Sequence, residues 1–248
     1  MEKERCRSYR THPAHAFFLL FLLSIAVLRP VNGHAAEQVT EPAQSGTEAA
    51  DETAAPAPGK TEKTNKKAER LIRTAEAEIG YSTNAKKEKT KYEKEIFGSN
   101  GHLWCASFVS WCSVKAGISS KRVPRSMSTL YMAERAKKNY SPWNKNTWKK
   151  LRRGDVFFIS PRKAKLRFAN GGKAVHHVGI VQRVDRENKL LYTVEGNVSR
   201  ITKKGEVDLS KRVVRACVYQ MKPKSGKILK SETGFSDGEY ICGTIRIK

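Results

Sequence analysis

The spacing of apolar residues changes once along this chain, from a helical period to a strand period. Between about residues 66 and 140 they recur at three- and four-residue steps, which is typical of helices. One such stripe consists of Ala68, Leu71, Ile72, Ala75 and Ile79. From residue 156 onward, short segments alternate or are rich in β-branched residues, which is typical of strands. This order favours an α+β fold, with N-terminal helices packed on a C-terminal antiparallel β-sheet.

The individual elements are predicted from this spacing and from the residues that end it. Gly80 and Gly117 each supply a helix stop, and a further helix is expected after Pro124. The polar segment 86–97 is expected to form a loop or a short helix. The predicted helices are 68–79, 105–116 and 126–140, and the predicted strands are 156–159, 175–182, 190–197, 212–221 and 239–247.

Cys105 lies at the predicted start of an amphipathic helix. There the free helix amides and the positive end of the helix dipole stabilise a thiolate, which lowers the thiol pKa from about 8.5 and favours nucleophilic attack. Cys112 lies seven residues further, roughly 10 Å along the helix axis, so these two thiols cannot form a disulfide. Because a free cysteine is ordinarily a small core residue, we assign that role to Cys112.

Two later predicted strands carry the partners that a nucleophilic thiol needs. His177 begins one strand, and Glu195 and Asn197 end the next. Because side chains alternate along a strand, Glu195 and Asn197 are expected on one face, and only one of His176 and His177 can face the thiol. A thiol, an imidazole and a carboxylate are the nucleophile, base and orienting group of acyl-transfer chemistry.

Four motifs follow one another along the chain: Trp104-Cys105-Ala106 with Phe108-Val109, Gly154-Asp155-Val156-Phe157-Phe158, His177-Val178-Gly179-Ile180-Val181 and Glu195-Gly196-Asn197. Over about residues 66–248 the sequence resembles CHAP domains, which are cysteine, histidine-dependent amidohydrolases and peptidases of the papain-like superfamily. The resemblance implies a papain-like fold with Cys105 as nucleophile, His177 as general base and Glu195 as the residue that orients the imidazole. Asn197 would be a further polar active-site residue. The family pattern selects His177 over His176, since it directly precedes Val178-Gly179.

The same resemblance suggests a function, because most CHAP domains cut bacterial peptidoglycan. The expected protein is an exported cysteine-dependent peptidoglycan hydrolase that cleaves an amide bond through a thioester acyl-enzyme. It would be an N-acetylmuramoyl-L-alanine amidase or a peptidoglycan endopeptidase. The alternative is a non-catalytic basic protein that binds cell wall or nucleic acid, and a further rival is a cysteine peptidase that acts on proteins.

No cofactor and no metal are expected. Some CHAP domains bind calcium through clustered acids near segment 86–97, whereas this chain has mainly lysines there, and calcium needs several converging oxygen ligands. His102, Cys105 and Cys112 are spaced poorly for tetrahedral zinc, and the chain has no Cys-x-x-Cys pair.

The N-terminal region divides into two expected segments before the domain. Residues 1–35 combine basic residues, an apolar run over 16–28 and small residues, which is the pattern of a cleaved secretory signal. An uncleaved anchor is the alternative, although the run is short for a spanning helix. Residues 36–62 are rich in acids, Ala, Thr and Pro and are expected to form a disordered tether. The basic catalytic domain would then occupy residues 63–248.

The chain carries a formal net charge of +24, which favours polyanionic surroundings. For an exported protein the expected partners are peptidoglycan and anionic wall polymers, and the expected location is secreted or wall-associated. The basic residues are dispersed and form no nucleic-acid recognition motif, so no specific nucleic-acid partner is expected. We expect a monomer without a stable membrane span after signal cleavage.

Two further cysteines lie in the last predicted strands. Since oxidising compartments permit disulfides, Cys217 and Cys242 either form one or remain two buried free thiols. Asp155 is predicted to be a turn residue; a catalytic carboxylate is its alternative role.

Overall fold

A computed structural model describes residues 65–86, 89–99, 103–161 and 175–248. These residues belong to one compact unit, Ala57–Lys248. The expected signal and tether lie outside the described residues and stay predictions. Within the described ranges, no helix is both long and apolar enough to cross a bilayer.

The helices begin and end at residues that satisfy their free backbone groups. The Asn65 side chain accepts hydrogen bonds from the first turn of the first helix, and Ser128 does the same for Tyr131, so the helix expected from residue 126 begins only at Thr129. The first helix ends at Glu76, because a series of turns replaces the helix over 77–80. The helices are α1 (Lys66–Glu76), α2 (Lys91–Phe97), α3 (Cys105–Lys115), α4 (Thr129–Ala136), the 3₁₀ helix η1 (Lys137–Asn139) and α5 (Thr147–Lys150).

All strand pairs among the described residues are antiparallel, and the fold is α+β as predicted. The sheet order is β1-β6-β5-β4-β3-β8-β2, and β7 pairs with both β6 and β8. Strands β3 to β8 therefore form a closed ring, which the sequence analysis did not predict. The strands are β1 (Ser82–Asn84), β2 (Tyr140–Pro142), β3 (Val156–Ser160), β4 (His177–Asp185), β5 (Leu190–Ile201), β6 (Val207–Lys222), β7 (Lys227–Ser231) and β8 (Tyr240–Ile245).

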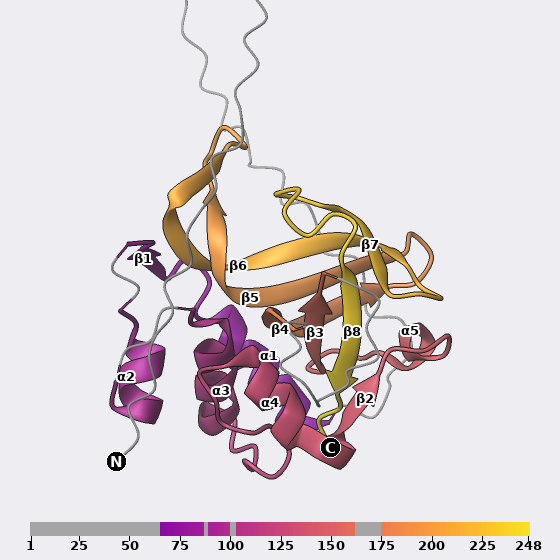
Figure 1. Cartoon of the computed structure of the whole chain (residues 1–248), viewed down its shortest axis with the longest axis horizontal. Coiled ribbons are helices and arrows are strands. Elements are labelled where there is room, and N and C mark those ends of the chain that lie inside the picture. Colours follow the sequence, from indigo (N-terminus) through magenta and orange to yellow (C-terminus); the bar gives the residue numbers. More distant parts are fainter. Residues whose placement is uncertain (1–64, 87–88, 100–102, 162–174) are drawn as a thin grey trace, which may run out of the picture. The chain divides into compact units, whose positions relative to one another are not determined.

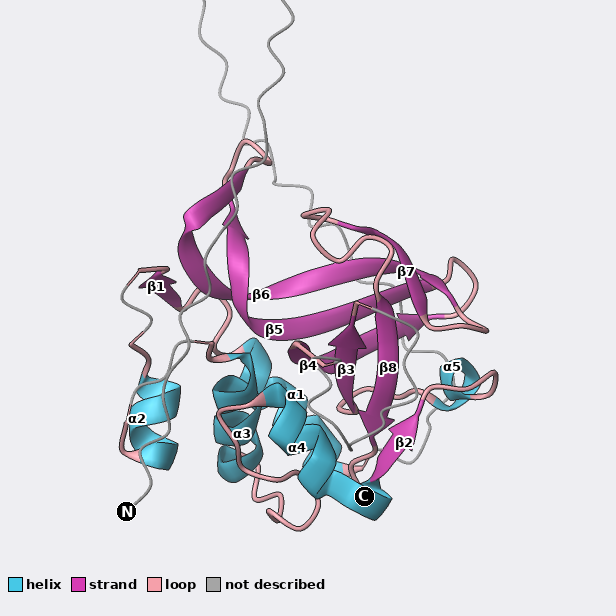
Figure 2. Cartoon of the chain, in the orientation of Figure 1, coloured by secondary structure: helices cyan, strands magenta, loops and turns pink. Residues whose placement is uncertain are grey.

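Helix α3 is the central helix of the domain. Helices α1 to α4 lie on one side of the strands, as Figure 2 shows, and α3 contacts α1, α2 and α4 as well as β4 and β5. Every residue from Cys105 to Ser113 is therefore buried. The prediction of an amphipathic helix is wrong here, because neighbouring elements cover the face that was expected to be polar.

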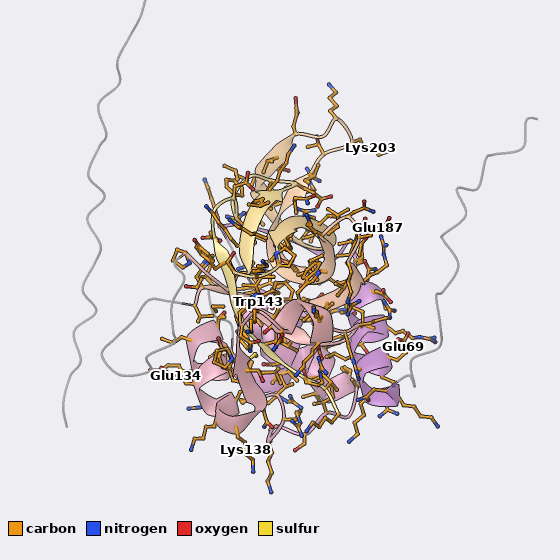
Figure 3. The ribbon with its side chains drawn as sticks, turned by 90° about the vertical axis from the view of Figure 1, so that its right-hand side faces the viewer. Glu69, Glu134, Lys138, Trp143, Glu187 and Lys203 are labelled. Atoms are coloured by element: carbon orange, nitrogen blue, oxygen red, sulfur yellow. The ribbon has the colours of Figure 1, made fainter. Side chains whose placement is uncertain are left out.

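The longest hairpin joins β5 to β6 and extends beyond the rest of the strands (Figure 1). Lys203 lies at its far end, while Lys138 lies at the opposite end of the domain (Figure 3). Basic side chains are thus spread over the domain, in agreement with the dispersed charge seen in the sequence.

Candidate active site

Cys105 is the first residue of α3, and its thiol is buried, with a residue exposure of 2%. Trp104 precedes it and provides no side-chain cap. The Phe108 N–H donates to the Trp104 carbonyl at 2.9 Å, so the N–H groups of Cys105, Ala106 and Ser107 precede the first helical hydrogen bond. These amides form the positive end of the helix dipole beside the sulfur.

His177 begins β4 and connects the thiol to a carboxylate. Its imidazole hydrogen-bonds to the Cys105 thiol. Its Nε2 atom lies 2.6 Å from Glu195 Oε2, which leaves Nδ1 as the ring nitrogen available to the sulfur. The His177 side chain is 14% exposed, so the ring touches solvent while both of its partners are buried.

Glu195 lies in β5 and is completely buried. In addition to His177, its carboxylate accepts hydrogen bonds from Tyr219 Oη at 3.0 Å and from Thr193 Oγ1. Burial by itself raises the pKa of this carboxyl, but the hydrogen bond and charge of His177, together with the two hydroxyl donors, outweigh burial and lower the pKa. Glu195 is therefore held as a carboxylate that orients the imidazole.

The thiol and the imidazole shift each other's pKa toward an ion pair. Burial opposes ionisation of Cys105, yet the hydrogen bond and charge of His177 lower the thiol pKa below its usual value, with smaller help from Thr129 and the Ala106 amide. Burial likewise opposes the charged form of His177, whereas Cys105 and Glu195 together raise its pKa to about 10. Both directions favour the thiolate and imidazolium pair over the neutral pair, and the thiolate is the reactive form of a cysteine nucleophile.

His176 occupies a different position from its neighbour. Its Nε2 atom lies 3.0 Å from Glu239 Oε1, and its side chain is 47% exposed. The structure therefore brings His177, and not His176, to the thiol.

Asn197 lies in an irregular part of β5. Its φ angle is 63°, and the register of β5 against β6 shifts between Glu195 and Val198. The expected strict alternation is wrong at this point, because a β-bulge interrupts it. Asn197 nevertheless lines the same cavity as Glu195, and its Oδ1 atom is buried without a hydrogen-bond partner among the described residues.

Two motif glycines allow these elements to approach one another. A Cβ atom on Gly196 would lie 2.7 Å from the Phe108 side chain of α3, and one on Gly179 would lie 2.7 Å from Glu195 Cγ. Any larger residue at either position would push α3 or Glu195 away. The two glycines therefore set how closely the thiol, the imidazole and the carboxylate can meet.

Three site residues were missed by the sequence analysis. Thr129 Oγ1 lies 3.4 Å from Cys105 Sγ, and Thr193 and Tyr219 hold Glu195. Thr193 could have been found, because it lies two residues before Glu195 on the same strand. Nothing in the local sequence indicates Thr129 or Tyr219, since their positions depend on how α4 and β6 pack.

The four predicted site residues line one cavity of about 400 Å³. Its walls come mainly from the α3 start, the β4 start, β5, β6 and the segment after β7. The other residues lining it include Leu103, His176, Ser199, Leu209, Arg212, Arg215, Cys217, Tyr219, Glu232 and Phe235. A substrate that enters this cavity would meet the side chains of Cys105 and His177.

Cys112, Cys217 and Cys242 are the other cysteines among the described residues, and they are buried free thiols, as is Cys105. Burial raises the pKa values of Cys112, Cys217 and Cys242. Of the two alternatives for Cys217 and Cys242, the structure has two free thiols, because β6 and β8 are separated by β7 on one side of the ring.

Asp155 is a buried turn residue that pairs with Arg246 at 3.2 Å and does not line the cavity.

In segment 86–97, where some CHAP domains bind calcium, this chain has a lysine that pairs with a carboxylate. Lys91 Nζ lies 2.7 Å from Glu78 Oε2, at the start of α2. In the part of the chain that the structure describes, no three His, Cys, Asp or Glu side chains converge as metal ligands would. The expectation that the protein needs no metal and no cofactor stays a prediction.

A buried thiol, an imidazole and a carboxylate linked in this order define a cysteine, histidine-dependent hydrolase site. Comparison with protein families agrees, because residues 97–197 match the CHAP domain model. The resemblance seen in the sequence is confirmed over this range, because the matching model is that of CHAP domains, which are cysteine, histidine-dependent amidohydrolases and peptidases. The matched range includes all four predicted site residues. No curated protein and no solved structure matches this chain.

Proposed function

We propose that this protein is an exported peptidoglycan hydrolase that cleaves an amide bond through a thioester on Cys105. It acts as an N-acetylmuramoyl-L-alanine amidase or as a peptidoglycan endopeptidase. The helices on one side of an antiparallel sheet, with the nucleophile at a helix start and the base on a strand, support a papain-like arrangement. The CHAP match supports the hydrolase class.

One observation carries the proposal: the hydrogen-bonded series from Cys105 through His177 to Glu195 lies at an open cavity. A purely structural cysteine would need neither a base nor a carboxylate to orient that base. Cys112 in the same helix has neither and shows the structural case.

The reaction follows from the protonation states at the site. The Cys105 thiolate attacks the amide carbonyl carbon, and imidazolium His177 then donates its proton to the leaving amine as the C–N bond breaks. The product is a thioester on Cys105 and a free amine. Neutral His177 next removes a proton from water, the hydroxide attacks the thioester, and Cys105 leaves as thiolate with the acid released. Glu195 keeps the ring oriented and stabilises its cation.

The start of α3 supplies donors for the oxyanion. The N–H groups that precede the first helical bond lie beside the attacking sulfur, where negative charge develops on the carbonyl oxygen. One such donor contributes typically about 3 to 4 kcal/mol to transition-state stabilisation.

Two features of the sequence support the wall as substrate. The signal-like segment 1–35 directs the domain outside the cell, and the net charge of +24 attracts anionic wall polymers. The same charge holds the enzyme near its substrate without a separate binding repeat, and it accounts for a secreted or wall-associated location.

The test is release of new chain ends from purified peptidoglycan. We expect the intact protein to release new amino groups, Cys105→Ala to release none above background, and Cys112→Ala to retain activity. Cys112 is the matched control, because it is a buried thiol in the same helix that lies outside the cavity. Mass spectrometry of the fragments identifies the bond, since each candidate bond leaves different termini.

Equal results for the intact protein and Cys105→Ala would reject the hydrolase. Wall sedimentation of both proteins in that case would favour the non-catalytic wall-binding alternative. Cysteine-dependent cleavage of protein substrates, with none of peptidoglycan, would favour the cysteine peptidase.

A further inference from the structure

Among the described residues that line the active-site cavity, the acidic and basic side chains and the Cys105 thiol have a partner of opposite or complementary charge, with one exception. Cys105, His177 and Glu195 form the hydrogen-bonded series described above. His176 pairs with Glu239, which lies outside the cavity lining. The other charged side chains that line the cavity are Arg212, Arg215 and Glu232.

Arg215 is neutralised by Glu232. Its Nη1 atom lies 2.6 Å from Glu232 Oε2 and also donates to the Ala216 carbonyl at 2.9 Å. The Arg215 side chain is 16% exposed, so this pair is partly shielded from solvent. Arg215 therefore stabilises the wall of the cavity and leaves it no net charge.

Arg212 is the uncompensated cation. Its Nη1 atom donates to Ser199 Oγ at 2.5 Å, and it forms no ion pair with a carboxylate of the described residues. A guanidinium has five N–H donors in a planar fork, so most of its donors remain available. Ser199 lies opposite Arg212 in the register of β5 and β6, and its hydroxyl holds the guanidinium at the cavity.

The same cavity has an apolar rim of three residues from separate segments. Leu103 precedes α3, Leu209 lies on β6, and Phe235 lies between β7 and β8. They are 63%, 57% and 60% exposed, which is unusual for large apolar side chains that gather at one opening. Once a substrate covers this rim, water is excluded and an ion pair inside becomes stronger.

We propose that Arg212 is a specificity-determining residue that binds a carboxylate of the substrate while the apolar rim covers the chain that carries it. The inference rests on the proposed function, and the ligand is then a free carboxylate of the peptidoglycan stem peptide. The guanidinium fork forms two parallel hydrogen bonds with the two carboxylate oxygens. A stem peptide whose carboxylate is amidated loses the charge and one acceptor, and it binds less well.

The experiment combines an enzyme variant with a substrate change. Soluble stem-peptide fragments are prepared in pairs, in which one carboxylate at a time is either free or amidated, and KM and kcat are measured for the intact protein and for Arg212→Gln. At one carboxylate position, we expect the intact protein to have a KM roughly tenfold to a hundredfold lower for the fragment with the free carboxylate than for the amidated fragment. Arg212→Gln loses that preference, with a smaller change in kcat.

Two further variants distinguish carboxylate binding by the Arg212 guanidinium from a general effect of positive charge. Lys211→Gln removes one positive charge from the adjacent residue of β6, which lies opposite Asn84 and does not line the cavity. It keeps the substrate preference. Arg212→Lys keeps the charge without the fork, so it restores part of the preference lost in Arg212→Gln.

The inference is overturned if the intact protein treats every pair alike, or if Arg212→Gln weakens the free and amidated substrates by the same factor. Failure of the proposed function has a different signature, which is the absence of Cys105-dependent cleavage of any fragment. In that event, binding of the same pairs to Cys105→Ala is measured by calorimetry, and equal affinities for free and amidated peptides overturn the role of Arg212.

Discussion

The two ends of helix α3 carry the same side chain in opposite chemical states. Cys105 and Cys112 are both buried, 2% and 0% exposed, and belong to the same helix. The pKa of Cys105 is lowered, whereas that of Cys112 is raised by burial and by the nearby charge of Glu78. Burial is common to both thiols, so it does not explain the difference. Only Cys105 lies at the helix start, where the amides and the dipole contribute a small part of the shift. The larger difference is the partner, because His177 from β4 reaches only the first thiol.

This comparison shows where the reactivity of the site originates. The start of a helix offers amides and a partial positive charge, which are worth about 0.3–1 kcal/mol in exposed helices. Desolvation of a thiolate in a packed core costs more than that. Only a hydrogen-bonded cation, which the strands supply, reverses the balance at Cys105.

Removal of the imidazole should abolish most of the pKa difference between Cys105 and Cys112. His177→Gln should reduce hydrolase activity by about six orders of magnitude, since loss of the base disables the whole catalytic unit. It should also move the onset of Cys105 alkylation by iodoacetamide to higher pH, toward the behaviour of Cys112. Alkylation rates measured against pH check this. An unchanged profile would mean that the helix, and not His177, activates the thiol.

Glu195→Gln should have the next largest effect, a loss of about four orders of magnitude in activity, as expected when the orienting carboxylate becomes an amide. The carboxylate raises the pKa of His177, and the group with the raised pKa is protonated below that pKa. Activity of the intact protein should therefore fall on the alkaline side as pH rises through the raised His177 pKa, and on the acid side as pH falls through the lowered Cys105 pKa.

In Glu195→Gln the alkaline limit should move to lower pH, because the charge that stabilises the imidazolium is absent. The pH profile of kcat/KM for both proteins is the measurement. An alkaline limit that stays in place would show that Glu195 does not act through the imidazole.

Gly196→Ala tests whether the close packing of α3 against β5 is needed to place Cys105, because the added methyl group should push the two elements apart. The added Cβ would lie 2.7 Å from Phe108, so the helix start has to move or the core has to strain. We expect a loss of about 1–3 kcal/mol in the free energy of unfolding, measured by urea denaturation. Activity should fall further than stability explains, since Cys105 moves with the helix. Wild-type stability in this variant would show that α3 is packed less closely than the structure indicates.

Thr129→Val gives the smallest expected effect. It removes the hydroxyl 3.4 Å from Cys105 Sγ at similar volume, and this hydroxyl helps to lower the thiol pKa. We expect an activity loss of a few fold, since one hydrogen bond contributes about 1 kcal/mol. The alkylation profile should shift slightly to higher pH. The same substitution should leave Cys112 unchanged, because that thiol lies seven residues away along α3.

Several elements and motifs were predictable because their signals are local. The positions of Cys105 at a helix start and His177 at a strand start follow from spacing and from residue type. By contrast, β7 was missed, since Lys227–Ser231 has a weak strand pattern and is stabilised by pairing with β6 and β8. The burial of α3 on all sides was missed for a related reason, because distant elements cover it.

The sequence by itself determined the α+β order, the resemblance to CHAP domains and the residue types expected to perform the chemistry, because each of those signals is a short motif or a periodic segment of neighbouring residues. Tertiary structure decided which hydroxyls hold Glu195, and it brought the Cys105 thiol, the His177 imidazole and the Glu195 carboxylate into hydrogen-bonding contact. It also left Arg212 without an acidic partner at the cavity. The reason is that a pKa depends on charges and hydrogen bonds across space, and packing alone places Cys105, His177 and Glu195 together.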